Sequence, residues 1–484
     1  MSQIDKEHGT ASQQHGGTQF HLLSFEGPDS YAQAGGLATR VSGLAEALAA
    51  EEFETHLWYV GDPALPGHES QGLLRLHRWC QWISRHHPGG VYDGECGKQP
   101  DFADSLPPFL LREHVFPAVK RGEAVVVLAE EWHTVDAVLH LDWLLRRSGL
   151  RSRVALLWNA NNTFGFERID WPRLNAAATI TTVSRFMRQE MWRHGVDALV
   201  IPNGISADAL QPVDRGLITA LRARMHDRLV LSKVARWDPD KRWLLAVDTI
   251  ADLKQRGMRP LLIARGGVEE HGTDVFARAA MHGLEVVERR AACADGAAIL
   301  DSLAGLEHAD IVSIDTPLSP RAIRTLFGAS AAVLANSGRE PFGLVGLEAM
   351  ASGSVTCVGG TGEEYVVPGW NALVLQTENP REFLSQFAPL AADPGAAHLM
   401  RQRAVATARR FLWPEVVRRN LLPRVRFLCP TPDPGSADAG SLPAKTHTRP
   451  ASGNAPHARH LPTCARTTRT RRTDCKVGTS ATSS

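Results

Sequence analysis

Short apolar runs alternate with amphipathic segments along most of this chain. In the first half the apolar runs predict strands at residues 21–25, 54–60, 124–129, 154–158, 179–183 and 199–201. Between them, residues 37–50, 135–147 and 185–194 repeat apolar positions with helical spacing. Strands that alternate with helices form parallel sheets covered by helices, so this half is expected to be a doubly wound α/β domain.

The same pattern stops near Asn203-Gly204 and begins again at residues 229–235. Further strand-like runs follow at residues 260–264, 284–287, 311–314, 332–335, 355–358 and 372–375. Two such units predict two Rossmann-like domains facing a cleft, with ligands bound at the carboxyl ends of the strands. We expect an N-terminal domain over residues 19–205 and a C-terminal domain over residues 206–411.

Two segments depart from this rhythm. Residues 62–110 are rich in Gly, Pro, His and Trp, which predicts a long insertion of loops and short helices. Within it, residues 75–87 interleave Trp79 and Trp82 with basic residues. Helical spacing predicts a half-buried helix there, and a surface that stacks on an acceptor sugar is the alternative.

The two ends of the chain are polar. Residues 1–18 are expected to be disordered, and residues 430–484 collapse to Ser, Thr, Pro, Ala and Arg, which predicts a disordered basic tail. The alternative is that this basic tail binds nucleic acid or another acidic surface, because basic segments attract polyanions. A final helix is expected over residues 412–428, where Leu412-Trp413-Pro414-Glu415 opens it.

Bulk composition excludes several classes. A chain of 484 residues is too long for one core, and its net charge of +1 gives no reason to expect a nucleic-acid or membrane partner. No apolar run reaches the roughly 18 residues that a transmembrane segment needs, and the N-terminus lacks the apolar core of a signal peptide. Seven cysteines without a CxxC pair support neither a zinc site nor a disulfide framework, so a cytoplasmic location is predicted.

Two glutamates with seven residues between them flank a tight turn. Glu340 precedes Pro341 and Gly343, which end the strand at residues 332–335, and Glu348 lies in the helix that follows. The start of that helix has free N–H groups and a partial positive charge, which suit a phosphate. Carboxylates beside it accept hydrogen bonds from hydroxyls. The pattern therefore suits a ligand that is half sugar and half phosphate.

One further turn follows the first strand of each half. Arg236 and Lys241 flank an Asp-Pro turn after residues 229–235, so their side chains can converge beyond the strand end. Gly35 and Gly36 follow the first strand of the chain and open a helix. Paired glycines let the backbone approach a ligand without a Cβ clash. Both turns therefore suit an anionic ligand, while an exposed charged loop and an ordinary turn are the alternatives.

These motifs resemble those of retaining glycosyltransferases of family 4 and of the related glycogen and starch synthases. The resemblance covers about residues 19–428 and is strongest over residues 228–376. It implies the GT-B fold, in which a terminal helix returns to the N-terminal acceptor domain and the C-terminal domain binds the nucleotide-sugar donor. It also implies that Arg236 and Lys241 grip the donor diphosphate, which the loop at Gly35 and Gly36 meets as well.

The resemblance also assigns roles to the residues around the two glutamates. Glu340 is placed at the donor sugar, and Glu348 is placed at the ribose. The backbone of Phe342, Gly343 and Leu344 is expected to contact the sugar and the phosphate. Arg236, Lys241 and Glu340 are the residues to which a catalytic role is assigned.

Other matches are incomplete. Gln33 stands where the synthases have a lysine, and Trp158 stands beside Asn159 where many relatives have a histidine. The segment from Glu131 to Thr134 resembles an Asp-Trp-His motif, which places His133 near the cleft. His133, Asn159 and Asn161 are thus candidate sugar or acceptor contacts. A structural histidine at a helix start and an Asx-turn loop are the alternatives.

The expected function is retaining transfer of a sugar, a hexose, from a nucleotide-diphosphate sugar to an acceptor hydroxyl, with no cofactor and no metal ion. The alternatives are a sugar-nucleotide epimerase or hydrolase on the same scaffold, and a non-catalytic carbohydrate-binding protein. A dinucleotide-dependent dehydrogenase is disfavoured, because no G-x-G-x-x-G follows the first strand.

Overall fold

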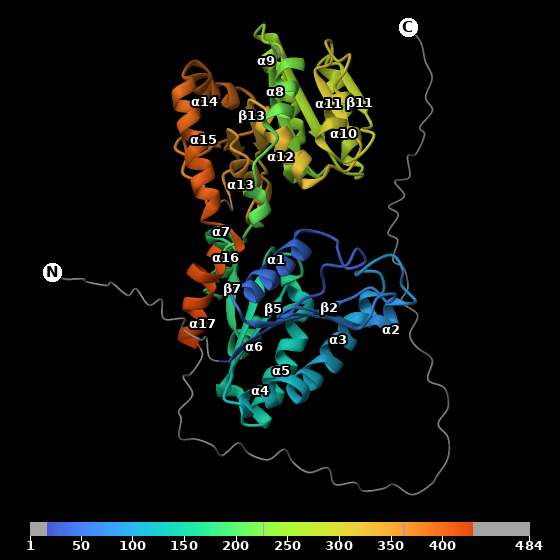
Figure 1. Cartoon of the computed structure of the whole chain (residues 1–484), viewed down its shortest axis with the longest axis vertical. Helices are drawn as coiled ribbons and strands as arrows, with labels where there is room; N and C mark the ends of the chain where they lie inside the picture. Colours follow the sequence, from blue (N-terminus) through green and yellow to red (C-terminus); the bar gives the residue numbers. More distant parts are fainter. Residues whose placement is uncertain (1–16, 226, 362–363, 429–484) are drawn as a thin grey trace, which may run out of the picture. The chain divides into compact units, whose positions relative to one another are not determined.

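The computed structural model describes residues 17–225, 227–361 and 364–428. It contains two separate β-sheets, each covered by helices (Figure 1). The prediction of two doubly wound α/β units is confirmed. The predicted disorder of residues 1–18 is wrong at its last position, because Thr18 begins β1. Residues 1–16 and the predicted disordered tail over residues 430–484 lie outside the described residues.

The first sheet has eight strands in the order β3-β4-β2-β1-β5-β6-β7-β8, and only the β3–β4 pair is antiparallel. The strands are β1 (Thr18–Leu23), β2 (Glu54–Val60), β3 (His68–Gln71), β4 (Leu74–Trp79), β5 (Ala124–Glu130), β6 (Val154–Ala160), β7 (Thr179–Thr182) and β8 (Leu199–Val200). The chain reverses its direction of travel across the sheet between β1 and β5. In open α/β sheets this switch point is where ligands bind.

Helices cover both faces of this sheet because both faces of its strands are apolar. Phe20 and Leu22 of β1 pack in a core with α1 (Gly36–Ala50), whereas Leu23 packs in a core on the opposite face, to which α3 (Glu95–Leu110) and α5 (Val135–Arg147) contribute. The remaining elements here are α2 (Gln81–Ser84), η1 (Leu111–Val115), α4 (Phe116–Lys120), η2 (Trp132–Thr134), η3 (Arg151–Arg153), η4 (Phe166–Arg168), α6 (Trp171–Ala177) and α7 (Arg185–Trp192).

The second sheet has seven parallel strands in the order β11-β12-β10-β9-β13-β14-β15, with its switch point between β9 and β13. They are β9 (Leu229–Val234), β10 (Pro260–Arg265), β11 (Val286–Arg289), β12 (Ile311–Ile314), β13 (Ala332–Ala335), β14 (Thr356–Val358) and β15 (Leu373–Val374). The predicted domain boundary at residue 205 falls between β8 and η5 (Ala207–Leu210).

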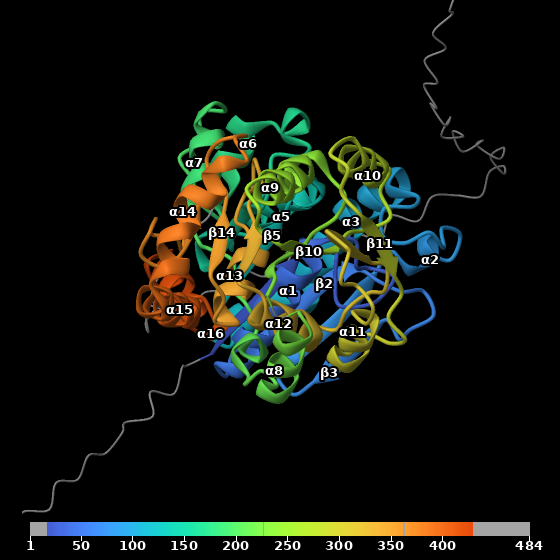
Figure 2. The same ribbon diagram turned by 90° about the horizontal axis from the view of Figure 1, so that it is seen from above.

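Helices also cover both faces of the second sheet. Seen from above, α9 (Trp243–Gln255) and α10 (His271–Met281) lie on one side of β10 (Figure 2). On the other side lie α8 (Arg215–Arg224), α11 (Gly296–Ser302) and α12 (Pro320–Ala329). The elements η6 (Pro239–Lys241), α13 (Leu344–Ala351), α14 (Arg381–Ala392) and α15 (Pro394–Arg409) complete this half.

The prediction of a helix over residues 75–87 is wrong. Leu74–Trp79 form β4, which pairs with β2, and only the short α2 follows it. Both faces of β4 are covered, so buried positions follow one another instead of alternating, and a helix produces a similar pattern. The insertion also contains α3, a helix of 16 residues with Pro100, Pro107 and Pro108 inside it, where only short helices were expected.

The last described segment returns to the first half of the molecule. Three consecutive helical segments, α16 (Trp413–Val416), η7 (Val417–Leu421) and α17 (Leu422–Leu428), pack into the core that contains α1. Trp413 fills the space that two glycines leave open. A Cβ at Gly43 would lie 2.2 Å from its indole nitrogen, and one at Gly204 would lie 2.6 Å from its ring. The helix therefore occupies the residues where the sequence places it.

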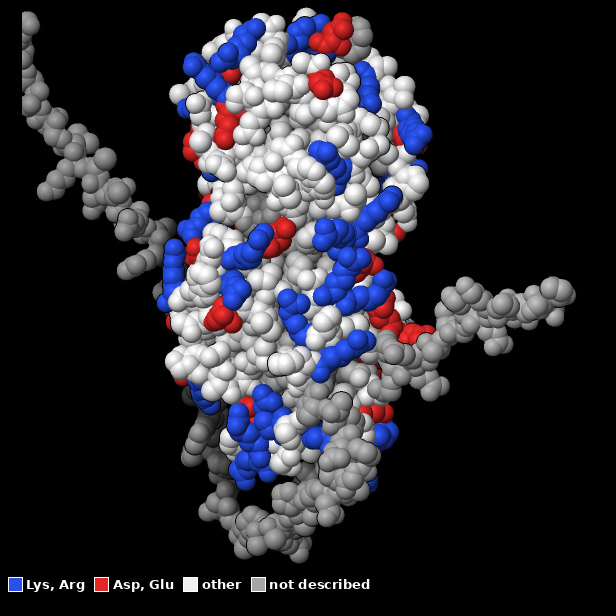
Figure 3. All heavy atoms as spheres, turned by 90° about the vertical axis from the view of Figure 1, so that its left-hand side faces the viewer, with Lys and Arg blue, Asp and Glu red and all other residues white. Residues whose placement is uncertain are grey.

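The face that carries these last helices is basic. Residues 394–428 contain eight arginines and a single acid, Glu415, so the charge here differs from the near-neutral whole chain. Lys and Arg side chains gather on this side of the molecule (Figure 3). Across the described ranges, no helix combines the length and the apolar character needed to cross a bilayer.

Candidate active site

A cavity of about 1240 Å³ lies at the carboxyl ends of strands from both sheets. From the first half it is lined by the start of α1, the loop after β6 and one side of α7. From the second half it is lined by the ends of β9 and β13 and the turns that follow them. Of the residues singled out from the sequence, the cavity wall contains Gly36, Asn161, Arg236, Lys241, Glu340, Phe342, Gly343 and Leu344.

Lys241 and Glu340 are brought together by the switch point of the second sheet. Lys241 ends η6 after β9, and Glu340 follows β13, the neighbouring strand. The Lys241 ammonium donates to Glu340 Oε2, and both side chains are half-buried. Asp238 caps η6 by accepting from the N–H of Asp240 at 2.8 Å, which fixes the turn that presents the lysine. The cavity thus holds a cation already paired with a carboxylate.

Arg236 is the complementary cation. It is exposed on the cavity wall, and among the described residues its guanidinium has no ion-pair partner. Its backbone is held, because its carbonyl accepts from the Trp243 indole N–H at 2.7 Å. A guanidinium on a fixed backbone offers a planar fork of donors to an oxyanion.

The helix start at α13 adds backbone donors to the same wall. Gly343 has φ 76°, a left-handed conformation that favours glycine, and it caps the eight-residue helix. The Tyr365 hydroxyl donates to the Gly343 carbonyl at 2.5 Å, and the Phe342 ring packs against Tyr365. Aromatic packing beneath the turn therefore holds the N–H groups at the start of α13 toward the cavity, where an anion is favoured.

Glu348 lies one turn further along α13 and is not on the cavity wall. Burial raises its pKa to about 7. Its assignment to a ribose therefore stays a prediction.

The sequence reasoning missed Lys233. This residue of β9 is 1% exposed, lines the cavity and donates to the Leu334 carbonyl at 3.1 Å and to Asn336 Oδ1 at 2.9 Å. Burial, followed by the nearby charges of Lys241 and Arg242, lowers its pKa to about 7. The available signal was a lysine inside an otherwise apolar strand, which is costly unless the ammonium has partners.

The start of α1 already holds a carboxylate. Glu26 Oε2 accepts from the N–H groups of Gly35 at 3.0 Å and Ala38 at 3.0 Å, and its Oε1 accepts from the Tyr92 hydroxyl at 2.7 Å. Gly35 is therefore engaged with Glu26 and is absent from the cavity wall, whereas Gly36 lies on it. A Cβ at Gly36 would meet nothing within 4 Å, so this backbone is open to a ligand.

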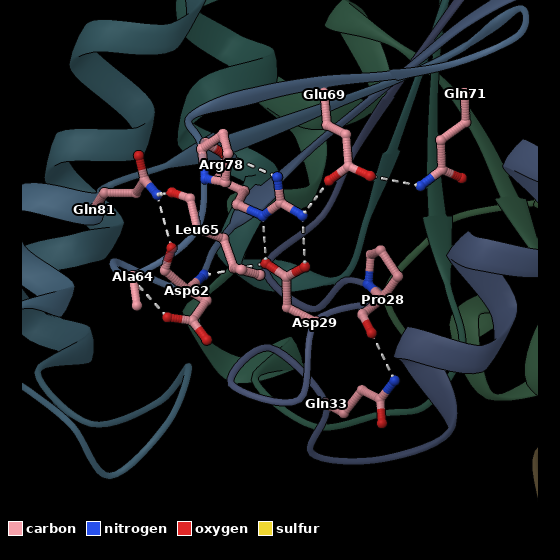
Figure 4. Close-up of polar contacts among 11 residues, drawn as sticks. Pro28, Asp29, Gln33, Asp62, Ala64, Leu65, Glu69, Gln71, Arg78 and Gln81 are labelled. Atoms are coloured by element: carbon pink, nitrogen blue, oxygen red, sulfur yellow. Dashed lines mark hydrogen bonds and ion pairs between the residues drawn. The ribbon is translucent and has the colours of Figure 1, made fainter.

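The loop between β1 and α1 is held by the insertion (Figure 4). Arg78 of β4 forms a bidentate ion pair with Asp29 at 2.8 and 3.0 Å, and both side chains are buried. Gln33 donates to the Pro28 carbonyl at 2.8 Å, within the same loop. The residue that replaces the synthases' lysine thus makes a local contact, and the insertion fixes the shape of the loop.

A buried network supports the opposite wall. Glu130, at the end of β5, accepts from Arg40 Nε at 3.1 Å, from Asn159 Nδ2 at 2.9 Å and from Asn161 Nδ2 at 2.8 Å. Arg40 also donates to Asn203 Oδ1 at 2.5 Å. Asn159 is fully buried and outside the cavity wall, whereas Asn161 is on it. The structure therefore separates two candidates that the sequence treated alike.

Glu131 is held in a strained conformation next to this network. Its φ of 67° and ψ of 166° belong to a region that is essentially restricted to glycine. Its Oε1 accepts from the Asn161 N–H at 2.7 Å, and its carbonyl accepts from the Trp158 indole at 3.0 Å. Burial, partly opposed by these bonds, raises the pKa of Glu131 to about 8. Trp158, in the position of the relatives' histidine, is thus a buried support.

His133 lies outside the cavity wall. Its Nε2 pairs with Glu95 Oε1 at 2.8 Å, and its ring stacks on Phe25 with centroids 4.5 Å apart. Burial lowers its pKa to about 3. These contacts are those of a neutral histidine that ties η2 to α3, and a sugar contact stays a prediction without geometric support.

Part of the chain is similar to a known family. A sequence model of Glycosyltransferase Family 4 matches residues 34–209, whereas the motifs in the second half carry most of the resemblance described above. The chain is 27% identical over 223 residues to the D-inositol 3-phosphate glycosyltransferase of Actinosynnema mirum, which covers 44% of this chain and 48% of the relative. The match thus spans about half the length of that curated relative.

Solved structures share the fold. Sucrose-phosphate synthase from Thermosynechococcus elongatus matches with a TM-score of 0.56 and 17% identity over 84% of this chain and 99% of that one. The catalytic domain of starch synthase IV from Arabidopsis thaliana, bound to ADP and acarbose, matches with a TM-score of 0.56 and 15% identity over 83% of this chain and 100% of that one. These matches show a fold of the GT-B type.

Proposed function

We propose that this chain is a glycosyltransferase that transfers a hexose from a nucleotide-diphosphate sugar to an acceptor hydroxyl with retention of anomeric configuration. The family 4 match over residues 34–209 and the GT-B type of fold support this proposal. One observation carries the proposal. Arg236, Lys241, Glu340 and the start of α13 converge on one cavity at the switch point of the second sheet.

The chemistry follows from where charge develops. When the bond from the sugar to the diphosphate breaks, the leaving phosphate gains negative charge. Arg236 and Lys241 supply two fixed cations for that charge, and the N–H groups at the start of α13 supply a third source of positive potential. Groups preorganised in this way stabilise a transition state by a few kcal/mol each, about 3 kcal/mol in well-studied cases.

Glu340 orients both Lys241 and the donor sugar. Its carboxylate accepts from Lys241, and its remaining lone pairs are available to hydroxyls of the donor sugar. The acceptor hydroxyl attacks from the same face of the sugar that the diphosphate leaves, and the departing phosphate receives its proton. Transfer in this scheme uses the two cations and needs neither a metal ion nor a cofactor.

The other wall is assigned to the acceptor. Asn161, fixed by Glu130 and Glu131, and the loop that follows it present amide groups that suit sugar hydroxyls. The starch synthase structure contains ADP and acarbose, and the curated relative is named for an inositol phosphate acceptor. A further structure with this fold contains UDP. ADP- and UDP-hexoses are therefore the donors to test first, with sugar phosphates and inositol phosphates as acceptors.

The test is release of nucleoside diphosphate by the full chain, with and without each acceptor. Release that requires an acceptor, together with a product of the donor's anomeric configuration by NMR, supports a retaining transferase. Acceptor-independent conversion of the donor would indicate the epimerase or hydrolase. Binding of donor without any turnover across the screen would indicate a carbohydrate-binding protein.

A further inference from the structure

Three histidines from distant parts of the chain meet under the first sheet. His21 of β1 and His56 of β2 are direct partners in the strand register, and His114 lies in the π-helix η1 that covers this face. One ring nitrogen from each of the three lies within 4.8 Å of the others. None of the three lines the cavity proposed as the active site.

The covering segment is unusual. The π-helix η1 follows α3, whose last turn contains Pro107 and Pro108. Proline removes a backbone donor, which disrupts the regular ladder, and π-helical turns occur frequently at functional sites. His114 is half-buried, whereas His21 is 0% exposed and His56 is 3% exposed. Solvent therefore reaches the cluster on the side of His114 and not on the side of the two strands.

The buried nitrogens at the cluster lack hydrogen-bond partners. His21 Nε2 and His56 Nε2 are both buried without one. An unpaired buried polar atom is costly, so it calls for a missing partner. The nearest acid is Glu54, whose Oε1 lies 3.3 Å from His56 Nε2 and whose side chain is partly exposed. Its charge favours a cation at the cluster.

A chain of histidines also orients His56. Its Nδ1 lies 2.9 Å from His77 Nε2, and His77 Nδ1 lies 2.8 Å from His68 Nδ1. If each ring donates to the next, the lone pair of His56 Nε2 carries no proton and is available to a metal ion. Histidines that bind metals ordinarily donate their other ring nitrogen to a partner in this manner.

We infer that His21, His56 and His114 form a binding site for a divalent transition-metal ion of the zinc class, which ties η1 to β1 and β2. Imidazole nitrogens suit zinc, nickel and copper, and three histidines leave a fourth position for water. The site has a structural role in this scheme, and sugar transfer does not depend on it.

Metal binding must replace one contact. The Trp58 indole donates to His21 Nδ1 at 3.3 Å, which leaves the proton of neutral His21 on Nε2. Ligation through Nε2 moves that proton to Nδ1 and removes this long hydrogen bond. Its loss leaves the Trp58 indole N–H and the His21 Nδ1–H without each other as partners, and metal ligation must outweigh this cost.

The experiment uses the untagged full chain, freed of metal by chelator and dialysed. Titration with Zn²⁺ against a chromophoric chelator is expected to show one tight equivalent, with a dissociation constant below about 1 μM, and an increase in Tm. His114→Asn removes the most exposed ligand and is expected to weaken this equivalent about 100-fold, with unchanged far-ultraviolet circular dichroism.

The matched control is His398→Asn, the same change at an exposed histidine of α15. It is expected to bind Zn²⁺ as the wild type does. Absence of a tight equivalent in the wild type would overturn the inference. Equal Zn²⁺ affinity in His114→Asn and wild type would also overturn it, because the ion would then occupy another site.

Discussion

Lys241 and Glu340 form an ion pair across the cavity wall although 99 residues separate them. The pair exists because β9 and β13 are adjacent in the second sheet, so the turns that follow them meet. A half-buried pair of this kind holds both side chains in one geometry before a ligand arrives. It therefore links the two motifs of the second half into one site.

Loss of either cation is expected to impair turnover. Arg236→Ala and Lys241→Ala should each lower kcat about 10²–10³-fold, because the leaving diphosphate loses a fixed positive charge. Steady-state kinetics with the donor identified by the screen measures this. Lys254→Ala, which removes an ion pair with Asp310 far from the cavity wall, is the control and should retain wild-type kcat. Near-normal turnover in both cavity variants would remove their catalytic assignment.

Gly36 and Gly343 make a matched pair of glycine tests. A methyl at Gly36 meets nothing within 4 Å, so Gly36→Ala should leave stability unchanged but raise the donor KM about tenfold if phosphate approaches there. Gly343→Ala places a side chain at φ 76°, which should cost about 1–2 kcal/mol of stability. Thermal unfolding and donor kinetics measure both. An unchanged KM in Gly36→Ala would remove Gly36 from the donor site.

Substitutions of Asn159 and Asn161 should affect different properties, because Asn159 is buried and Asn161 lies on the cavity wall. Asn159→Ala removes two buried hydrogen bonds, the one to Glu130 at 2.9 Å and the one from the Thr181 hydroxyl at 2.8 Å, so it should lower stability by about 1–3 kcal/mol. Asn161→Ala should mainly raise the acceptor KM, because Asn161 lies on the cavity wall and its bond to Glu130 holds this loop in place. Urea unfolding and acceptor kinetics test this pair. The reverse pattern would contradict the division between support and contact.

Stability should depend on pH through Glu131. Its pKa in the fold is about 8, above the value of 4.5 expected when unfolded, so the folded state binds the extra proton between these values. The stability from this group is complete below pH 4.5 and is lost as the pH rises through 8, at up to about 1.4 kcal/mol per pH unit. Glu131→Gln cannot titrate. Its stability relative to wild type should therefore increase from pH 5 to about pH 8, and a constant difference would contradict the assignment.

The sequence could predict the parts of the site that local order determines. Arg236 and Glu340 lie in the turns that follow two strands, and parallel strands bring such turns to one edge of a sheet. The alternation of apolar runs likewise predicts both sheets, since strands buried on both faces stand out as short apolar segments.

The remainder depends on tertiary contacts. Lys233 and Glu130 are buried in strands, and only the completed packing shows which partners make their burial tolerable. The strand β4 was mistaken for a helix because neither of its faces is exposed. His21, His56 and His114 are isolated in the sequence and meet only through the register of β1 with β2 and the position of η1.

The most direct test of the account is calorimetric titration of the full chain with the nucleoside diphosphate that the donor screen identifies. The wild type is expected to bind one equivalent, Arg236→Ala to bind it about 10–100-fold more weakly through loss of a bidentate contact, and Lys254→Ala to bind it as the wild type does. Equal affinity in Arg236→Ala and wild type would contradict the claim that this cavity holds the donor diphosphate.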